Sequence, residues 1–124
     1  TWQRVVSQTP GGQASYAVYS DCKLGEGVSE DDFYNAYKAY AKAAKKLGDV
    51  AGRKMILPTS GVPSTWDYDF VQLVTTETIA DYGKNWTNFW SQATGESMPE
   101  LKALQDLGGS CENERTYGIV PVRN

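Results

Sequence analysis

The stretch that most constrains the fold is residues 66–74, with the sequence WDYDFVQLV. It is the longest run that favours a strand, because aromatic and β-branched side chains fit extended backbone. A helix with its own N-cap signal follows almost at once, and residues 15–47 show the same strand-then-helix order. The chain therefore predicts two related halves that contribute to one sheet.

Alternating and helical patterns predict the order β-α-β-β-α-α-β, in which the second of the two consecutive helices is short. Ser29 and Thr78 are the expected N-caps of the two longer helices, and Ser97 with Glu100 forms a capping box before the short one. Gly48 is the expected end of the first helix. The expected strands are residues 13–23, 53–57, 66–74 and 115–122.

This order predicts an α+β fold of the ferredoxin-like βαββαβ plait, with helices on one face of an antiparallel sheet. We expect one domain over residues 15–124 and a lead-in over residues 1–14. The first and last strands of the plait are antiparallel neighbours, so Cys22 and Cys111 lie at adjacent strand ends and are expected to form a disulfide. The alternative is two buried thiols. A disulfide would indicate an oxidising compartment.

Composition excludes several classes of function. The 124 residues include no histidine and only two cysteines, which removes the usual general base, haem ligand and zinc ligands. A hard-ion site of carboxylates is still possible, but no EF-hand-like spacing is present, so no metal or cofactor is expected. A net charge of −3 argues against nucleic acid, and no apolar run is long enough to cross a membrane. The start at Thr1, without Met, predicts a periplasmic or secreted protein after signal-peptide removal, although a trimmed chain would look the same.

The candidate catalytic residues are Asp69 and Tyr19. A carboxylate buried on the central strand would suit a general base, because burial raises the pKa of a carboxyl group. A strand tyrosine such as Tyr19 or Tyr68 would hold a developing oxyanion. The alternative is that Asp69 pairs with Arg53 or Lys54 and has no catalytic role.

The candidate ligand-binding residues are Tyr16, Arg53, Trp66, Tyr68 and Tyr117. The planar guanidinium of Arg53 could clamp an anion, whereas the strand tyrosines and Trp66 could line a pocket and its mouth. Each has a simpler interpretation, namely packing for the aromatic residues and a solvated edge charge for Arg53. The tyrosines of the helices, Tyr37, Tyr40 and Tyr82, are expected to pack in the core.

The segment DCKLGEGVS, residues 21–29, leads into Phe33 and Tyr37 and resembles the strand-loop-helix entry of the dimeric α+β barrel superfamily. The resemblance implies a homodimer formed by facing sheets, with a ligand pocket between sheet and helices in each subunit. Members include cofactor-free monooxygenases, polyketide cyclases and haem-degrading enzymes. The histidines on which the haem-degrading members and many of the cyclases depend are absent here, so those sites are not carried over.

Three hypotheses follow. The first is an exported homodimer that binds a small aromatic or apolar ligand in a binding or accessory role. The second is a cofactor-independent monooxygenase or cyclase-like enzyme acting on an aromatic or polyketide-like substrate. The third is a structural interaction module. The enzyme needs a closed pocket that contains Asp69 or a strand tyrosine with a shifted pKa, the binding protein needs only an apolar cavity, and the module needs neither.

Overall fold

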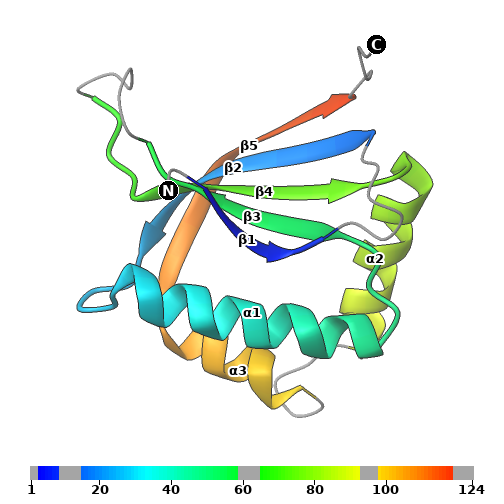
Figure 1. Cartoon of the computed structure of the whole chain (residues 1–124), viewed down its shortest axis with the longest axis horizontal. Helices are drawn as coiled ribbons and strands as arrows, with labels where there is room; N and C mark the ends of the chain where they lie inside the picture. Colours follow the sequence, from blue (N-terminus) through cyan, green and yellow to red (C-terminus); the bar gives the residue numbers. More distant parts are fainter. Residues whose placement is uncertain (1–2, 9–14, 59–64, 93–97, 119–124) are drawn as a thin grey trace.

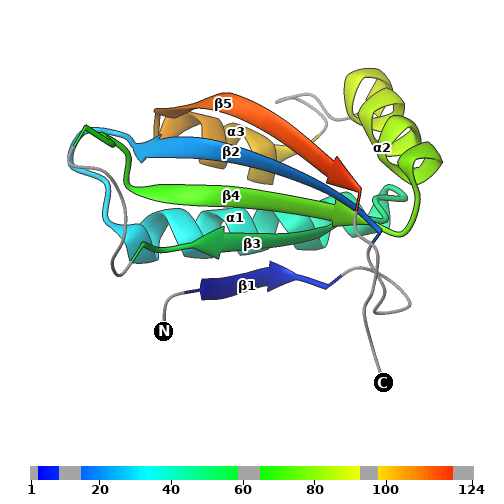
Figure 2. The same ribbon diagram turned by 90° about the horizontal axis from the view of Figure 1, so that it is seen from above.

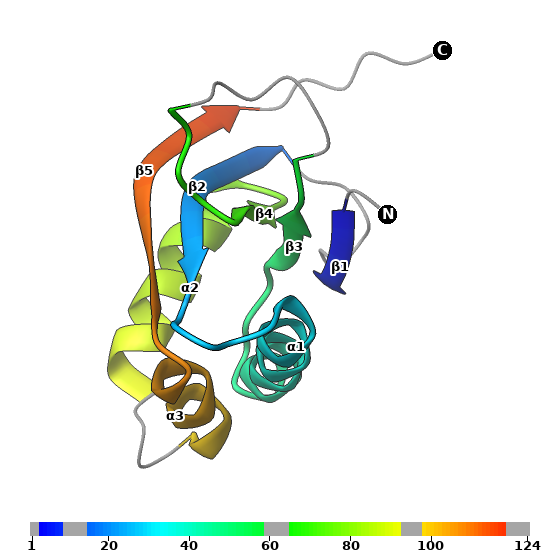
Figure 3. The same cartoon turned by 90° about the vertical axis from the view of Figure 1, so that its left-hand side faces the viewer.

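The computed structural model describes residues 3–8, 15–58, 65–92 and 98–118, with three helices on one side of a curved sheet (Figures 1 and 3). In chain order the elements are β1 (Gln3–Ser7), β2 (Tyr16–Leu24), α1 (Glu30–Lys46), β3 (Gly52–Ile56), β4 (Phe70–Thr76), α2 (Ile79–Gln92), α3 (Pro99–Asp106) and β5 (Gly109–Gly118). The five strands form one sheet in the order β1-β3-β4-β2-β5, and all neighbours are antiparallel.

The predicted α+β class and antiparallel sheet are confirmed, but the exact ferredoxin-like order is not matched. The difference arises within the expected lead-in, where Gln3–Ser7 forms an edge strand beside β3 and places Val5 opposite Lys54. A five-residue strand is too short to show a clear alternating pattern, and its pairing depends on a segment about fifty residues away.

Local signals define α1 as predicted. The Ser29 hydroxyl accepts a hydrogen bond from the Asp32 amide at 3.1 Å, and acidic residues occupy the first turn, where the helix dipole favours them. Tyr37, Tyr40 and Ala44 are buried at helical spacing. Gly48 follows the C-cap with a φ of 98°, a conformation that favours glycine. Thr78 likewise accepts from the Asp81 amide at 3.0 Å at the start of α2.

The central strand begins four residues later than predicted, at Phe70 rather than Trp66. Asp69 marks the change, because its amide donates to the Cys22 carbonyl and its carboxylate accepts from the Leu24 amide, at 2.8 and 2.7 Å. The Leu24 amide of β2 thus bonds to the side chain of Asp69 and not to a backbone carbonyl, and the regular pairing of β2 with β4 stops there. The strand-like composition of residues 66–68 was misleading for this reason.

The last strand was also misplaced. The prediction was residues 115–122, whereas β5 runs from Gly109 to Gly118, and residues 119–122 lie outside the described ranges. Most of β5 is exposed, so its polar sequence lacks the alternation that marks a half-buried strand. The preceding helix begins at Pro99 with Met98 as N-cap and no side-chain cap bond, while the predicted cap Ser97 lies outside the described residues.

The predicted Cys22–Cys111 disulfide is confirmed. The two cysteines are directly opposite each other in the pairing of β2 with β5, and their Cα atoms are 4.1 Å apart. Cys22 is fully buried in the core and Cys111 is exposed, so the alternative of two buried thiols is wrong. The bridge fixes the exposed edge strand β5 to the interior of the sheet.

The core lies between the sheet and the two helices α1 and α3, which run beneath it, whereas α2 lies at one end of the sheet (Figure 2). Met55 of β3, Phe70 of β4 and Cys22 of β2 meet Tyr37 of α1 and Leu101 of α3 in this cluster.

Candidate functional site

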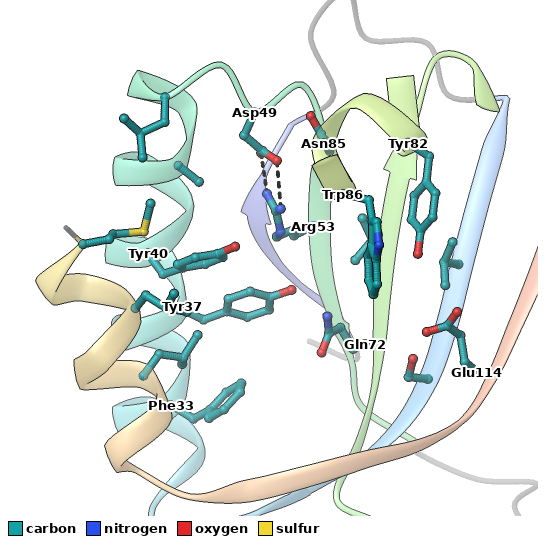
Figure 4. A pocket seen from close by; sticks show the side chains of 18 residues that line it. Phe33, Tyr37, Tyr40, Asp49, Arg53, Gln72, Tyr82, Asn85, Trp86 and Glu114 are labelled. Atoms are coloured by element: carbon teal, nitrogen blue, oxygen red, sulfur yellow. Dashed lines mark hydrogen bonds and ion pairs between the residues drawn. The ribbon is translucent and has the colours of Figure 1, made fainter. Parts of the chain in front are cut away.

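A cavity of about 340 Å³ lies between the sheet and the three helices (Figure 4). The helices contribute mainly apolar and aromatic side chains, and four strands contribute the floor. The lining includes Phe33, Tyr37 and Tyr40 of α1, Tyr82, Asn85 and Trp86 of α2, Met98, Leu101 and Leu104 at α3, and Val18, Ser20, Arg53, Gln72, Val74 and Glu114 of the sheet.

One wall of the cavity is a row of aromatic rings on α1. Tyr37 and Tyr40 are stacked with an interplanar angle of 22° and a centroid distance of 6.3 Å, and Phe33 packs against Tyr37 at 5.7 Å. Trp86 lies across the cavity from these rings and is 56% exposed (Figure 4). Because Trp86 both lines the cavity and reaches solvent, the cavity opens beside α2.

A buried ion pair closes the end of the cavity near the start of β3. Arg53 donates to both carboxylate oxygens of Asp49, at 2.6 and 2.9 Å, and each side chain is only 10% exposed. Burial lowers the pKa of Arg53, but the hydrogen bonds to Asp49 and the electrostatic effects of Tyr37, Asp49 and Tyr40 together outweigh burial, and the pKa is raised overall. Arg53 therefore stays charged, and its charge is balanced by Asp49. Its predicted alternative as a solvated edge charge is wrong.

Two buried polar atoms in the cavity wall have no hydrogen-bond partner among the described residues: the hydroxyl oxygen of Tyr37 and the amide nitrogen of Asn85. The amide oxygen of Asn85 accepts from the Val50 amide at 3.0 Å, which fixes the orientation of the side-chain amide. Burial raises the pKa of Tyr37, so its phenol is a neutral donor at physiological pH.

Of the predicted ligand-binding residues, only Arg53 lines the cavity. Tyr16 lies just outside it and packs against the lining residue Tyr82, with 5.3 Å between ring centroids. Tyr19 alternates with Val18 and Ser20, which line the cavity, so it faces the opposite side of the sheet.

The other predicted aromatic residues lie outside the cavity lining. Tyr117 packs edge-on against Tyr19 at 5.5 Å and is 53% exposed. Trp66 packs against Tyr68 at 5.5 Å, and the Tyr68 hydroxyl lies 3.2 Å from the Asn113 side-chain nitrogen, which donates to it. These contacts lie near Asp21, which accepts a hydrogen bond from the same Asn113 side chain. Asp21 and Tyr19 are two residues apart on β2 and therefore lie on the same face of the sheet.

Asp69, the predicted general base, is exposed and outside the cavity lining. Its carboxylate accepts from the Leu24 amide, so the predicted alternative of a pair with Arg53 or Lys54 is wrong. Asp67 pairs instead with Lys23 at 2.8 Å. The structure thus keeps the two neighbouring carboxylates apart from the cavity.

Sequence reasoning missed most of the cavity wall. Tyr37 and Tyr40 pack in the core as predicted, but they also line the cavity, as does Tyr82. A helix stripe that packs in a core has the same spacing as one that lines a cavity, so the spacing alone did not indicate the cavity. Two polar residues carried a usable signal. Gln72 shares a strand face with Phe70 and Val74, and Asn85 lies three residues after Tyr82 on the apolar face of a helix.

A second polar cluster lies on the sheet face away from the cavity, around the buried carboxylate of Asp21. Asn113 and Arg115 each donate to it at 3.1 Å. A bulge in the pairing of β5 with β2 lies at this point, and Asn113 has a φ of 57°. Burial raises the pKa of Asp21, but the hydrogen bonds from Asn113 and Arg115 and the positive charge of Arg115 together contribute to a pKa that is lowered overall.

We expect Asp21 to stabilise the fold at neutral pH and to lose this effect in acid. Its pKa is lower in the folded chain than the value of about 3.9 in unfolded peptides, so its contribution is present above about pH 4 and disappears as the pH falls through the folded value. Asp21→Asn should lower the free energy of unfolding at pH 7 by about 1–3 kcal/mol. Urea titrations should show that the difference in free energy of unfolding between Asp21→Asn and wild type is smaller in acid than at pH 7. The control Asp67→Asn changes an exposed carboxylate and should have little effect at either pH. A difference independent of pH would contradict this prediction.

Comparisons of the chain with protein-family models, with curated proteins and with solved structures found no match. Within the described ranges, no helix is both long and apolar enough to cross a membrane, and no group of three or more acidic, cysteine or histidine side chains could hold a metal ion. The interpretation of function therefore depends on the cavity itself: its size, its aromatic walls and its unpaired polar atoms.

Proposed function

We propose that this protein binds a small aromatic or apolar molecule in the cavity between sheet and helices, in a binding or accessory role. The observation that carries the proposal is the cavity of about 340 Å³, which lies in the range of small-molecule sites. Its wall combines stacked aromatic rings with a few polar groups, as ligand pockets do.

The test is a titration with the neutral fluorescent probe N-phenylnaphthylamine, whose emission rises in an apolar site. Wild-type protein should bind the probe, and Ser20→Phe should weaken binding at least about tenfold, because the larger side chain fills the cavity floor. Ser110→Phe is the matched control, since Ser110 is exposed on β5 and outside the lining.

Probe binding that is equal in Ser20→Phe and Ser110→Phe would place the probe elsewhere on the protein and contradict the proposal. Failure of wild-type protein to bind the probe would do the same. Thermal unfolding of both variants checks that a loss of binding by Ser20→Phe is not a loss of folded protein.

A cofactor-independent enzyme remains the alternative proposal, with weaker support. Asp69 and Tyr19 lie outside the cavity lining, so a substrate held in the cavity would not meet them. Among the polar groups of the cavity, Arg53 and Asp49 are paired with each other, and the Tyr37 hydroxyl and the Asn85 amide nitrogen are donors. These groups suit the binding of a ligand better than the abstraction of a proton, which needs a free base.

We further propose that the protein is an exported homodimer, as the dimeric α+β barrel resemblance implies. The position of all three helices on one side of the sheet supports an association through the other side, where Tyr117 is 53% exposed beside Tyr19 (Figure 3). The disulfide supports the periplasm or the cell exterior as the location, because such bonds persist in oxidising compartments.

A further inference from the structure

We infer that the cavity selects neutral aromatic carbonyl compounds, with the Tyr37 hydroxyl and the Asn85 amide nitrogen as donors to oxygen atoms of the ligand. This inference rests on the proposed binding function and adds the chemical class of the ligand. The observations that carry it are the unpaired donors, the charges of the lining residues and the aromatic wall.

The hydroxyl of Tyr37 is the first of these donors. Tyr37 is 3% exposed, its ring lines the cavity, and its hydroxyl makes no hydrogen bond of good geometry among the described residues. The Arg53 guanidinium lies close enough to lower the pKa of Tyr37, but it can only donate, so the phenol hydrogen has no acceptor. A buried polar group without a partner is costly, and a ligand that supplies the missing hydrogen bond recovers that cost. Figure 4 shows the Tyr37 side chain pointing from α1 into the space in front of Gln72.

Asn85 defines the polarity of the missing partner. The Val50 amide donates to its side-chain oxygen, so the unpaired atom is the nitrogen, which carries two N–H groups and can only donate. The ligand must therefore present an acceptor to this part of the wall. A carbonyl oxygen meets that requirement, and a carbonyl oxygen is equally suited to accept from the Tyr37 hydroxyl.

The charges of the lining favour a neutral acceptor over an anion. Three charged residues line the cavity, namely Arg53 at +1, Asp49 at −1 and Glu114 at −1, which sum to −1. Arg53 is already bound through two hydrogen bonds to Asp49 and has no excess charge to offer to a carboxylate. The nearly parallel rings of Tyr37 and Tyr40 belong to the aromatic wall of the cavity, which suits an aromatic ligand.

The test uses ligands that share one ring skeleton and compete with N-phenylnaphthylamine: fluorenone, fluorene, which lacks the carbonyl, and a fluorenone carboxylate. Wild-type protein should bind fluorenone about tenfold more tightly than fluorene, as expected for one or two new hydrogen bonds. The carboxylate should compete less well than fluorenone. Equal displacement by fluorenone and fluorene would overturn the inference.

Tyr37→Phe identifies the donor. The variant should reduce the preference for fluorenone over fluorene to less than about threefold, because it lacks the hydroxyl that donates to the carbonyl oxygen. A thermal unfolding curve checks that the variant is folded. Tyr34→Phe is the matched control on the same helix. The Tyr34 hydroxyl donates to the Val5 carbonyl at 2.9 Å and lies outside the lining, so its loss should lower the melting temperature and leave the ligand preference unchanged.

The outcomes separate this inference from the proposed function. Probe binding without a preference for fluorenone would overturn the inference and leave the proposed function standing. An absence of probe binding would overturn both. A preference that survives in Tyr37→Phe would exclude the Tyr37 hydroxyl as the donor and contradict the inference as stated.

Discussion

Reduction of the Cys22–Cys111 disulfide is expected to lower the free energy of unfolding by roughly 4–5 kcal/mol. The bridge joins residues 89 positions apart, and in the chain-entropy model a closed loop of this length removes that much conformational freedom from the unfolded chain. The loss is a large share of the total stability of a domain of this size. Urea denaturation of oxidised and dithiothreitol-reduced protein, followed by circular dichroism, measures the difference.

Comparing the two redox forms of one sequence keeps the sulfur atom of Cys22 in the core, so the difference reports the crosslink and not a cavity. Cys22→Ala with Cys111→Ala should lose somewhat more stability than reduction alone, because Cys22 is fully buried. Coincident unfolding curves for the oxidised and reduced proteins would show that the bridge does not stabilise the fold.

The second large effect is expected at the buried ion pair. Asp49→Leu leaves the charge of Arg53 buried without a partner, which should cost about 3–5 kcal/mol. The double substitution Asp49→Leu with Arg53→Met should recover most of the loss, since replacing both members of a buried pair by apolar residues is often neutral. Chemical denaturation of wild type, of the single variants Asp49→Leu and Arg53→Met, and of the double variant gives the coupling between the residues.

The exposed pair Lys102–Asp106 supplies the control for this prediction. Both of its side chains are 64% exposed, so Asp106→Leu should change the free energy of unfolding by less than about 1 kcal/mol. Equal losses for Asp49→Leu and Asp106→Leu, or a double variant as unstable as Asp49→Leu alone, would contradict the structural role assigned to the buried pair.

Local chemistry was enough to predict α1, α2 and the disulfide. The Ser29 and Thr78 caps act on amides three residues ahead, and the stripe of Tyr37, Tyr40 and Ala44 needs only helical geometry. The disulfide followed from topology, because antiparallel neighbours bring Cys22 to Cys111. These features are fixed by short-range signals or by connectivity, and both can be derived from the sequence.

The strand edges could not be predicted in this way. β1 exists because it pairs with β3, and most of β5 is exposed, so neither carries a hydrophobic alternation of its own. At Asp69 the carboxylate, rather than the backbone, accepts the next hydrogen bond, which moves the start of β4. Each of these boundaries depends on a partner that is distant in the sequence.

The cavity was only partly predictable for a related reason. Strand alternation places Tyr16 and Tyr19 on opposite faces of the sheet, but it does not tell which face the helices cover. Both tyrosines were therefore named as candidate site residues. Arg53 was identified as a polar group of the site, yet its partner Asp49 comes from the turn after α1, and that geometry depends on the left-handed conformation of Gly48. The position of α2, which brings Tyr82, Asn85 and Trp86 to the cavity, depends on tertiary packing.

Native mass spectrometry of the protein, isolated under non-reducing conditions from the cells that produce it, tests the proposed function most directly. We expect a dimer that carries a small neutral molecule of reproducible mass, which is absent from Ser20→Phe prepared in the same way. A monomer without adduct would contradict the homodimer. A wild-type protein that is bare, or an adduct retained by Ser20→Phe, would contradict ligand binding in the cavity.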